Sequence, residues 1–256
     1  MKQQTQSVPA NPADKVAKSA TRELISERDG KRLYHSEKPD LIIQEFVALS
    51  ATDDVAGNNA TSGQIVQMLR NEISSYFFEY IEGFRIPTNF VGRCSDSEMF
   101  VRTSEVFPII VRVYNASVGS FAKRLSLKEG QLLEFPVLEH YYTNEGKASM
   151  WANEYHLFAL GVLTPDDFRQ INRIATKTNA VLRSLCERRQ LMLVDLKLEF
   201  SKHKGQILLA DELSPLTCHI WDMTHDAKNG RDRFLLDRDQ PEVAITELRN
   251  RLLLKP

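Results

Sequence analysis

The chain has 256 residues, of which 42% are hydrophobic and 26% are charged, and its formal net charge is −1. This composition is typical of a globular protein with one large domain or two small ones, and the near-zero charge gives no reason to expect nucleic-acid partners. No apolar run reaches the roughly 20 residues that span a bilayer, and the first 40 residues contain no signal-peptide core. The three cysteines form no CxxC pair, so we expect neither zinc nor disulfides, and a cytoplasmic location.

Strand-like runs surround one long helix in the first half of the chain. Residues 1–20 are polar and lack apolar periodicity, so we expect a flexible tail there. A helix over 64–82 is predicted from apolar residues at helical spacing, and Gly83 ends it. Strands are predicted over 32–35, 41–47, 84–90, 99–103 and 109–114.

The clearest local signal in the second half is a helix start. Thr164 supplies a capping hydroxyl, Pro165 suits the first helical position, and two aspartates follow at the positive end of the helix dipole. A helix is therefore predicted over 164–188, with a short helix or turn over 121–127, a helix over 152–161 and a last helix from Pro241. Because strands and helices do not alternate regularly, the sequence predicts an α+β fold.

Residues 191–200 contain a strand with one charged face. From Asp195 onward charged and apolar residues alternate, so Asp195, Lys197 and Glu199 lie on the same side of the predicted strand. The alternative is that this is the solvated face of an ordinary amphipathic strand.

The segment that follows suggests a more specific use for this face. After a short polar link, a second strand-like run over 206–210 ends in the acidic pair Asp211 and Glu212. Folded as a hairpin, the segment brings Glu199 and Asp211 together with Lys197 beside them. Two carboxylates and an ammonium group suit a magnesium-bound polyphosphate.

A possible anion site lies over residues 112–125. A strand runs into Gly119 and Ser120 and then into a helical start that carries Lys123 and Arg124. Backbone amides at a glycine and a helix start, with a hydroxyl and basic groups nearby, suit an anion. Many basic turns are only solvated surface, and that alternative stays open on this motif alone.

The order of these motifs resembles the SAICAR synthetases (phosphoribosylaminoimidazole-succinocarboxamide synthases) of purine biosynthesis. The resemblance covers roughly residues 26–240. The motifs that carry it are, in chain order, PDLIIQEF (39–46), IPT (86–88), SDSEM (95–99), NASVGSFAKRL (115–125), VDLKLEF (194–200), ADELSP (210–215) and Trp221-Asp222.

The resemblance implies a fold with two lobes and the nucleotide between them. An ATP-binding N-terminal lobe over 21–108, related in shape to kinase and ATP-grasp folds, is expected to precede a C-terminal α+β lobe over 109–256 for substrate and Mg²⁺. The implied activity is that of an ATP-dependent C–N ligase. ATP activates the carboxylate of an aminoimidazole ribotide, and the amine of aspartate displaces phosphate. The implied partners are therefore a small-molecule carboxylate and amine, without nucleic acid or membrane, and a homo-oligomer is possible by resemblance only.

Roles at the nucleotide follow from the same resemblance, position by position. Glu199 and Asp211 are expected to hold Mg²⁺ and, with Lys31, to bind the nucleotide. Lys197 is expected to face the phosphates or the activated carboxylate, and Asp195 to help orient the substrate.

Substrate contacts are where the chain departs from the family. Ser120 is expected to contact the ribotide phosphate, with Lys123 beside it. The family has arginine at the positions of Tyr114 and His219, and Arg112 lies two residues from Tyr114 on the same strand face. Because arginine offers phosphate a bidentate fork that Tyr and neutral His lack, the usual ribotide should bind poorly if these positions face it.

The nucleotide loop also departs from the family pattern. The family's Gly-Lys-Ala-Lys falls on Arg28-Asp29-Gly30-Lys31 in an ungapped alignment, whereas a gap would recover Gly30-Lys31 as the Gly-Lys pair. Three functions therefore stay open. They are the standard purine reaction, a paralogue that uses a related acid or amine, and a catalytically silent nucleotide-binding or scaffold homologue.

Overall fold

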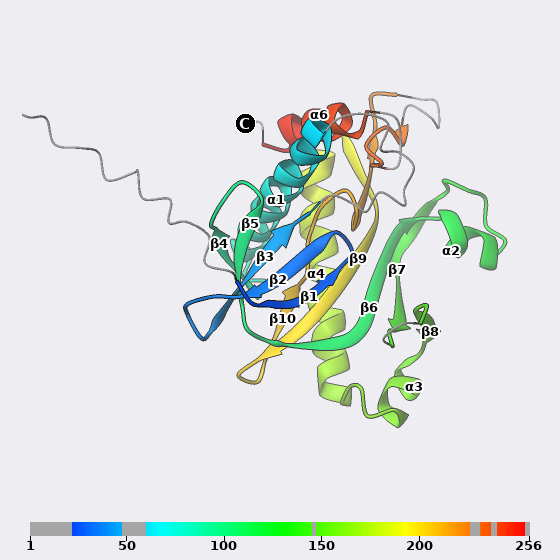
Figure 1. Ribbon diagram of the computed structural model, residues 1–256. Helices are drawn as coiled ribbons and strands as arrows, with labels where there is room; N and C mark the ends of the chain where they lie inside the picture. Colours follow the sequence, from blue (N-terminus) through cyan, green and yellow to red (C-terminus); the bar gives the residue numbers. More distant parts are fainter. Residues whose placement is uncertain (1–21, 48–59, 145–146, 226–230, 237–239, 254–256) are drawn as a thin grey trace, which may run out of the picture.

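Two antiparallel sheets form the body of the protein, as the computed structural model shows (Figure 1). The structure describes residues 22–47, 60–144, 147–225, 231–236 and 240–253, so the tail expected over 1–20 lies outside the described residues. The mixture of sheets and helices confirms the predicted α+β class.

The first sheet has five strands, all within the first 102 residues. Their spatial order is β1 (Leu24–Arg28), β2 (Lys31–His35), β3 (Leu41–Phe46), β5 (Glu98–Arg102) and β4 (Phe90–Arg93). A two-residue turn joins β1 to β2, in which Asp29 and Gly30 have φ angles of 50° and 67°. Positive φ at both positions is the signature of a type I′ hairpin, for which Asp-Gly is a preferred pair.

The second sheet is built around a long central strand. Its order is β10 (Gln206–Ala210), β9 (Leu191–His203), β6 (Glu105–Ala116), β7 (Leu132–Tyr142) and β8 (Met150–Ala152), and β11 (Cys218–Asp222) also pairs with β9. The predicted hairpin is confirmed, because β10 pairs with β9 in a register that sets Ala210 opposite Glu199.

Helices cover the apolar faces of the sheets. They are α1 (Ala60–Glu82), α2 (Gly119–Arg124), α3 (Glu154–Ala159), α4 (Pro165–Glu187) and α6 (Pro241–Leu253). The buried face of β9, formed by Leu196, Leu198 and Phe200, shares one core with Ile171 of α4 and Phe77 of α1. The opposite, charged face of β9 is therefore left for polar contacts.

The α4 helix begins as the sequence predicts. Thr164 Oγ1 accepts a hydrogen bond from the backbone N–H of Asp167 at 3.1 Å, and the Asp167 carboxylate accepts one from the backbone N–H of Thr164. This reciprocal pair is a capping box with Pro165 at its first helical position.

The sheets meet where one strand prediction is wrong. Residues 84–90 do not form a strand, since Arg85, in the turn after α1, has a φ of 60° and β4 begins only at Phe90. Instead, Asn89 N donates to Leu209 O and Leu209 N donates to Pro87 O, both at 2.9 Å. This segment thereby joins the first sheet to β10.

The other predicted elements match the structure with small shifts in their ends. Five strands that were not predicted are present, namely β1, β4, β7, β8 and β11. The predicted boundary near residue 108 falls inside β6, and α6 returns to pack on α1, where Arg249 and Glu72 form an ion pair at 2.6 Å. The division into lobes at 21–108 and 109–256 stays a prediction.

Among the described residues, no helix combines the length and apolar character that crossing a bilayer requires.

Candidate nucleotide and ligase site

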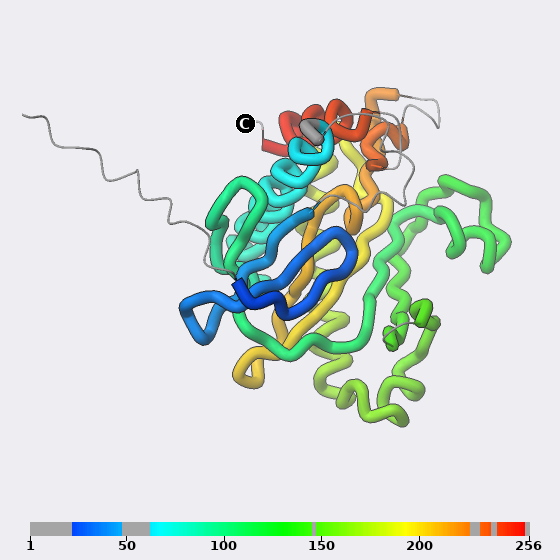
Figure 2. The backbone as a smooth tube through the Cα atoms, in the orientation of Figure 1, coloured from blue at the N-terminus to red at the C-terminus, as the bar shows by residue number. Residues whose placement is uncertain are grey.

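A cavity of about 470 Å³ lies between the first sheet and the β9–β10 hairpin. Figure 2 shows the blue β1–β2 hairpin lying across the yellow and orange strands at this place. One part of the lining is aliphatic and comes from Ile25, Leu33, Leu41, Ile42, Val101 and Val106. The other part is charged or polar and comes from Arg28, Lys31, Gln44, Glu199 and Asp211. A cavity of this size with an apolar part and a few converging polar groups is typical of a small-molecule site.

Glu199 and Asp211 both line the cavity, as the predicted hairpin requires. Because Ala210 lies opposite Glu199, a strand that continued regularly would place Asp211 on the other face of the sheet. Asp211 instead has a φ of 73°, which ends the strand and redirects the side chain. Left-handed backbone at a residue other than glycine is uncommon and is found preferentially at functional sites.

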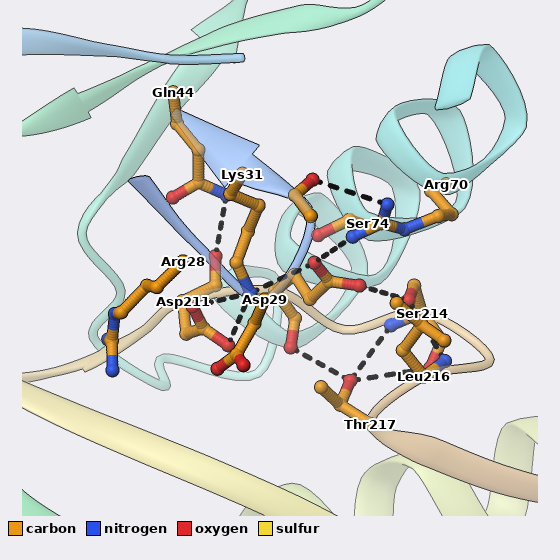
Figure 3. A network of polar contacts seen from close by, with 12 residues as sticks. Arg28, Asp29, Lys31, Gln44, Arg70, Ser74, Asp211, Ser214, Leu216 and Thr217 are labelled. Atoms are coloured by element: carbon orange, nitrogen blue, oxygen red, sulfur yellow. Dashed lines mark hydrogen bonds and ion pairs between the residues drawn. The ribbon is translucent and has the colours of Figure 1, made fainter. Parts of the chain in front are cut away.

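Lys31 joins the two sheets through the acidic pair that follows β10. Its Nζ lies 2.8 Å from Asp211 Oδ1 and 3.0 Å from Glu212 Oε2, and its side chain is buried. Figure 3 shows Lys31 extending to Asp211, while Gln44 donates to the backbone carbonyl of Asp211 at 3.0 Å. Although burial opposes its charge, the two carboxylates raise the pKa of Lys31, so it is an ammonium group.

Glu212 is held by a second cation that the sequence analysis did not single out. Arg70 of α1 is fully buried, and its Nη2 lies 2.8 Å from Glu212 Oε2. Burial alone would raise the pKa of Glu212, but Lys31 and Arg70 lower it to about 2. An arginine within the apolar stripe of a helix and a second acid beside Asp211 were the signals for this pair.

Asp211 differs from Glu212 although the two are adjacent. Burial raises the pKa of Asp211, Lys31 opposes that change, and the neighbouring charges of Glu199 and Glu212 raise it further. The single ammonium group of Lys31 is thus shared by Asp211 and Glu212.

Glu199 has two cationic neighbours, one from each sheet. Arg28 Nη2 lies 2.6 Å from Glu199 Oε2, and Lys197 Nζ lies 3.2 Å from Glu199 Oε1. Lys197 also lies 3.7 Å from Asp29 Oδ2 at the tip of the β1–β2 turn. The structure therefore brings Lys31, Lys197, Glu199 and Asp211 to one place, as the sequence analysis expected.

The donor set fits magnesium. Within the described residues, no group of three or more His, Cys, Asp and Glu side chains is arranged around a possible metal position. Mg²⁺ does not require one, because it binds one or two carboxylates and completes its shell with water and phosphate oxygens. Glu199 and Asp211 supply two such carboxylates beside the cavity.

A second polar cluster lies further along β9, around Asp195. His219 of β11 contacts Asp195 Oδ2 through Nδ1 at 3.1 Å and Asp232 Oδ1 through Nε2 at 2.8 Å. Trp221 also donates to Asp232, and Arg112 of β6 lies 3.5 Å from Asp195 Oδ1. Burial lowers the pKa of His219, but the two aspartates that its ring nitrogens contact raise it above its usual value.

Ser120 and Lys123 lie on α2, a separate element beyond the ends of β6 and β7 (Figure 1). Both side chains are exposed. The helix is fixed to the second sheet by stacking of Phe121 on Tyr114, with ring centroids 4.3 Å apart, and by an ion pair between Arg124 and Glu139. Contact of Ser120 and Lys123 with a ribotide phosphate stays a prediction.

Comparison with known proteins relates this chain to the SAICAR synthetases. The model of the SAICAR synthetase family matches residues 26–248. The phosphoribosylaminoimidazole-succinocarboxamide synthase of Chlorobaculum tepidum is 38% identical over 232 residues, which cover 90% of this chain and 97% of that protein. The corresponding synthase of Caldanaerobacter subterraneus is 38% identical over 233 residues, with the same coverage.

Solved structures agree with the sequence comparisons. A type-2 SAICAR synthetase in complex with ADP superposes with a TM-score of 0.80 at 33% identity, over 91% of this chain and 99% of that chain. The phosphoribosylaminoimidazole-succinocarboxamide synthase of Ehrlichia chaffeensis superposes with a TM-score of 0.79 at 27% identity, over 91% of this chain and 100% of that chain.

Proposed function

Because the chain belongs to the SAICAR synthetase family, we propose that it joins carboxyaminoimidazole ribotide to aspartate in an ATP-dependent reaction of purine biosynthesis. The protein is an ATP-dependent C–N ligase, and it uses ATP with Mg²⁺. The observation that carries the proposal is the convergence of Lys31, Glu199 and Asp211 on one cavity between the two sheets, with Lys197 paired to Glu199 beside it.

The cavity offers each part of the nucleotide a suitable surface. Its aliphatic lining suits a purine base, and its charged end suits the phosphates. Glu199 and Asp211 would hold Mg²⁺, which neutralises phosphate charge when it is bound. Lys31 is held in place by Asp211 and Glu212 and supplies positive charge at this end.

The reaction has two chemical steps. In the first step the terminal phosphoryl group of ATP is transferred to the substrate carboxylate. The remainder of the nucleotide leaves as ADP. The amine then attacks the activated carbonyl carbon, the C–N bond forms, and the bond from carbon to the phosphate oxygen breaks. Such chemistry needs positioning and charge stabilisation more than a protein nucleophile. Lys197 would stabilise the negative charge that develops on the phosphate and the activated carboxylate. Asp195, on the same face of β9, would orient the substrate.

The substrate side is proposed to extend from Asp195 to α2. Arg112 and His219 flank Asp195, and Ser120 and Lys123 are proposed to meet the phosphate of the ribotide. One observation favours a related acid instead, since both ring nitrogens of His219 already contact carboxylates and neither is free for a phosphate. We therefore retain a paralogue with a different acid or amine as the second candidate.

The partners that we propose are small molecules, in a cytoplasmic protein that binds neither nucleic acid nor membrane and that can form a homo-oligomer.

The deciding experiment is phosphate release from Mg·ATP by the purified protein, with product mass identifying the amide. Release with carboxyaminoimidazole ribotide and aspartate supports the standard reaction. Release only with another acid or amine identifies a paralogue. No release across a panel of acids and amines, despite Mg·ATP binding, favours the silent homologue and contradicts the proposed ligase.

A further inference from the structure

Arg28 forms an ion pair with Glu199, a carboxylate that is also proposed to bind the metal ion. Its guanidinium lies 2.6 Å from Glu199 Oε2, while its own side chain is 51% exposed and that of Glu199 only 5%. Arg28 lines the cavity at its charged end, and both Glu199 and Asp211 act on its charge. In this structure Arg28 therefore compensates the charge of a buried carboxylate from the solvent side.

This pairing changes once Glu199 binds a metal ion. A divalent cation on Glu199 and Asp211 would satisfy the carboxylate that Arg28 now neutralises, and it would repel the guanidinium. The guanidinium is then left at the charged end of the cavity, next to the place proposed for the phosphates. Arginine presents several N–H donors in a planar fork, which matches phosphate oxygens.

The local backbone allows this exchange without rearrangement of the sheet. Arg28 is the last residue of β1, directly before the two-residue turn at Asp29 and Gly30. In Figure 3 its side chain points away from Lys31, and the two cations contact different carboxylates. Lys31 is buried and held by two carboxylates, whereas Arg28 has one carboxylate partner and an exposed path.

We propose that Arg28 is a nucleotide-binding residue of this chain, which leaves Glu199 when the metal binds and grips a phosphate group of the nucleotide instead. The proposal rests on the proposed function, since it requires the nucleotide and metal in this cavity. In the ungapped alignment the family has a lysine at the position of Asp29. Arg28 would supply the positive charge that this chain lacks there.

Two measurements on the same variants test the exchange. The first is binding of Mg·ADP by titration calorimetry, and the second is binding of Mn²⁺ alone, a paramagnetic substitute for Mg²⁺. Arg28→Gln should weaken Mg·ADP binding about tenfold, the loss expected for one charge-assisted contact. It should also bind Mn²⁺ alone several-fold more tightly than the wild type, because the competing guanidinium is gone.

The matched controls come from the same hairpin. Arg32→Gln removes an exposed arginine that pairs with Glu27 and does not line the cavity, so it should change neither affinity. Arg28→Lys should restore part of the Mg·ADP affinity. Circular dichroism verifies that each variant is folded.

The outcomes separate this inference from the proposed function. If the wild type binds Mg·ADP and Arg28→Gln binds it equally well, the inference is overturned and the ligase proposal stands. If Arg28→Gln weakens Mg·ADP and Mn²⁺ alike, the arginine only maintains the shape of the site, and the exchange is wrong. If the wild type does not bind Mg·ADP, both proposals fail.

Discussion

Glu199 and Asp211 are the residues on which the metal assignment depends. Glu199→Gln or Asp211→Asn replaces a carboxylate by an amide of the same shape, which can still accept hydrogen bonds from neighbours such as Arg28 and Lys31. Because a neutral amide is a poor Mg²⁺ ligand, each variant should lose at least about 100-fold in ATP turnover, as for the loss of a key electrostatic group.

Phosphate release under saturating Mg·ATP measures this effect. Glu27→Gln, on the exposed part of the same β1–β2 hairpin, is the control and should retain full activity. Turnover at the wild-type rate in either cavity variant would refute the metal assignment.

Substitution of His219 tests whether this position binds the phosphate of the substrate. Its two ring nitrogens are both used by Asp195 and Asp232, whereas an arginine has five donors and could keep both contacts while offering another. His219→Arg should therefore raise kcat/KM for a phosphorylated ribotide by several-fold, with little change for an acid without phosphate. His219→Lys, a cation without the fork, serves as the comparison. An unchanged specificity constant in His219→Arg would place the phosphate elsewhere.

Individual side chains of the site were predictable where pattern alone sets them. The alternation along β9 places Lys197 and Glu199 on one face, and the hairpin brings Asp211 near them. The sequence does not show that Asp211 needs a left-handed backbone to reach the cavity, nor that Glu212 beside it turns to Arg70. Both depend on contacts between residues far apart in the chain.

The α4 helix is the element whose start is best defined by local sequence. Thr164→Ala removes the side-chain acceptor of the Asp167 N–H and one half of the capping box. Loss of such a cap costs about 1 kcal/mol, so the free energy of unfolding should fall by that amount. Urea denaturation monitored by circular dichroism measures it.

Thr164→Ser is the matched variant, because it keeps the hydroxyl and should be nearly as stable as the wild type. Equal losses in the alanine and serine variants would mean that the methyl group, and not the cap, stabilises this end of α4.

Helices and strands were predictable from the sequence where they are long or have clear capping or turn residues at their ends. Short elements were less predictable. The Asp29-Gly30 pair is itself a hairpin signal that identifies β1, although only the strand after it was predicted. The segment 84–90 has strand-like composition, but Arg85 and the approach to β10 prevent a strand. Tertiary contacts override local preference there.

The whole molecule is joined at the buried ion network of Lys31, Arg70 and Glu212. These residues come from β2, from α1 and from the segment after β10, so the network connects the first sheet, its covering helix and the second sheet. No local pattern relates positions 31, 70 and 212. The fold class followed from the sequence, but this connection between its parts required the three-dimensional structure.

Glu212 makes the stability of the whole protein depend on acid pH. The pKa of this carboxyl group is lowered from 4.5 to about 2 in the folded protein, because Lys31 and Arg70 outweigh the effect of burial. A group with a depressed pKa contributes stability that is fully present above about pH 4.5, its unfolded value, and is lost as the pH falls toward 2. Acid should therefore remove this contribution over that interval.

Glu212→Gln isolates the contribution. At pH 7 the variant leaves Arg70 buried without its charged partner, and it should be less stable than the wild type by about 3 kcal/mol. The difference should shrink as the pH falls from about 4.5 toward 2, since the wild-type carboxyl group then becomes neutral as well. Denaturant unfolding at a series of pH values measures both curves. Because the charge of Glu212 helps to raise the pKa of Asp211, both curves are measured in an Asp211→Asn background, which removes that second titration. A gap that stays constant down to pH 2 would show that Glu212 acts through shape and hydrogen bonding and not through its charge.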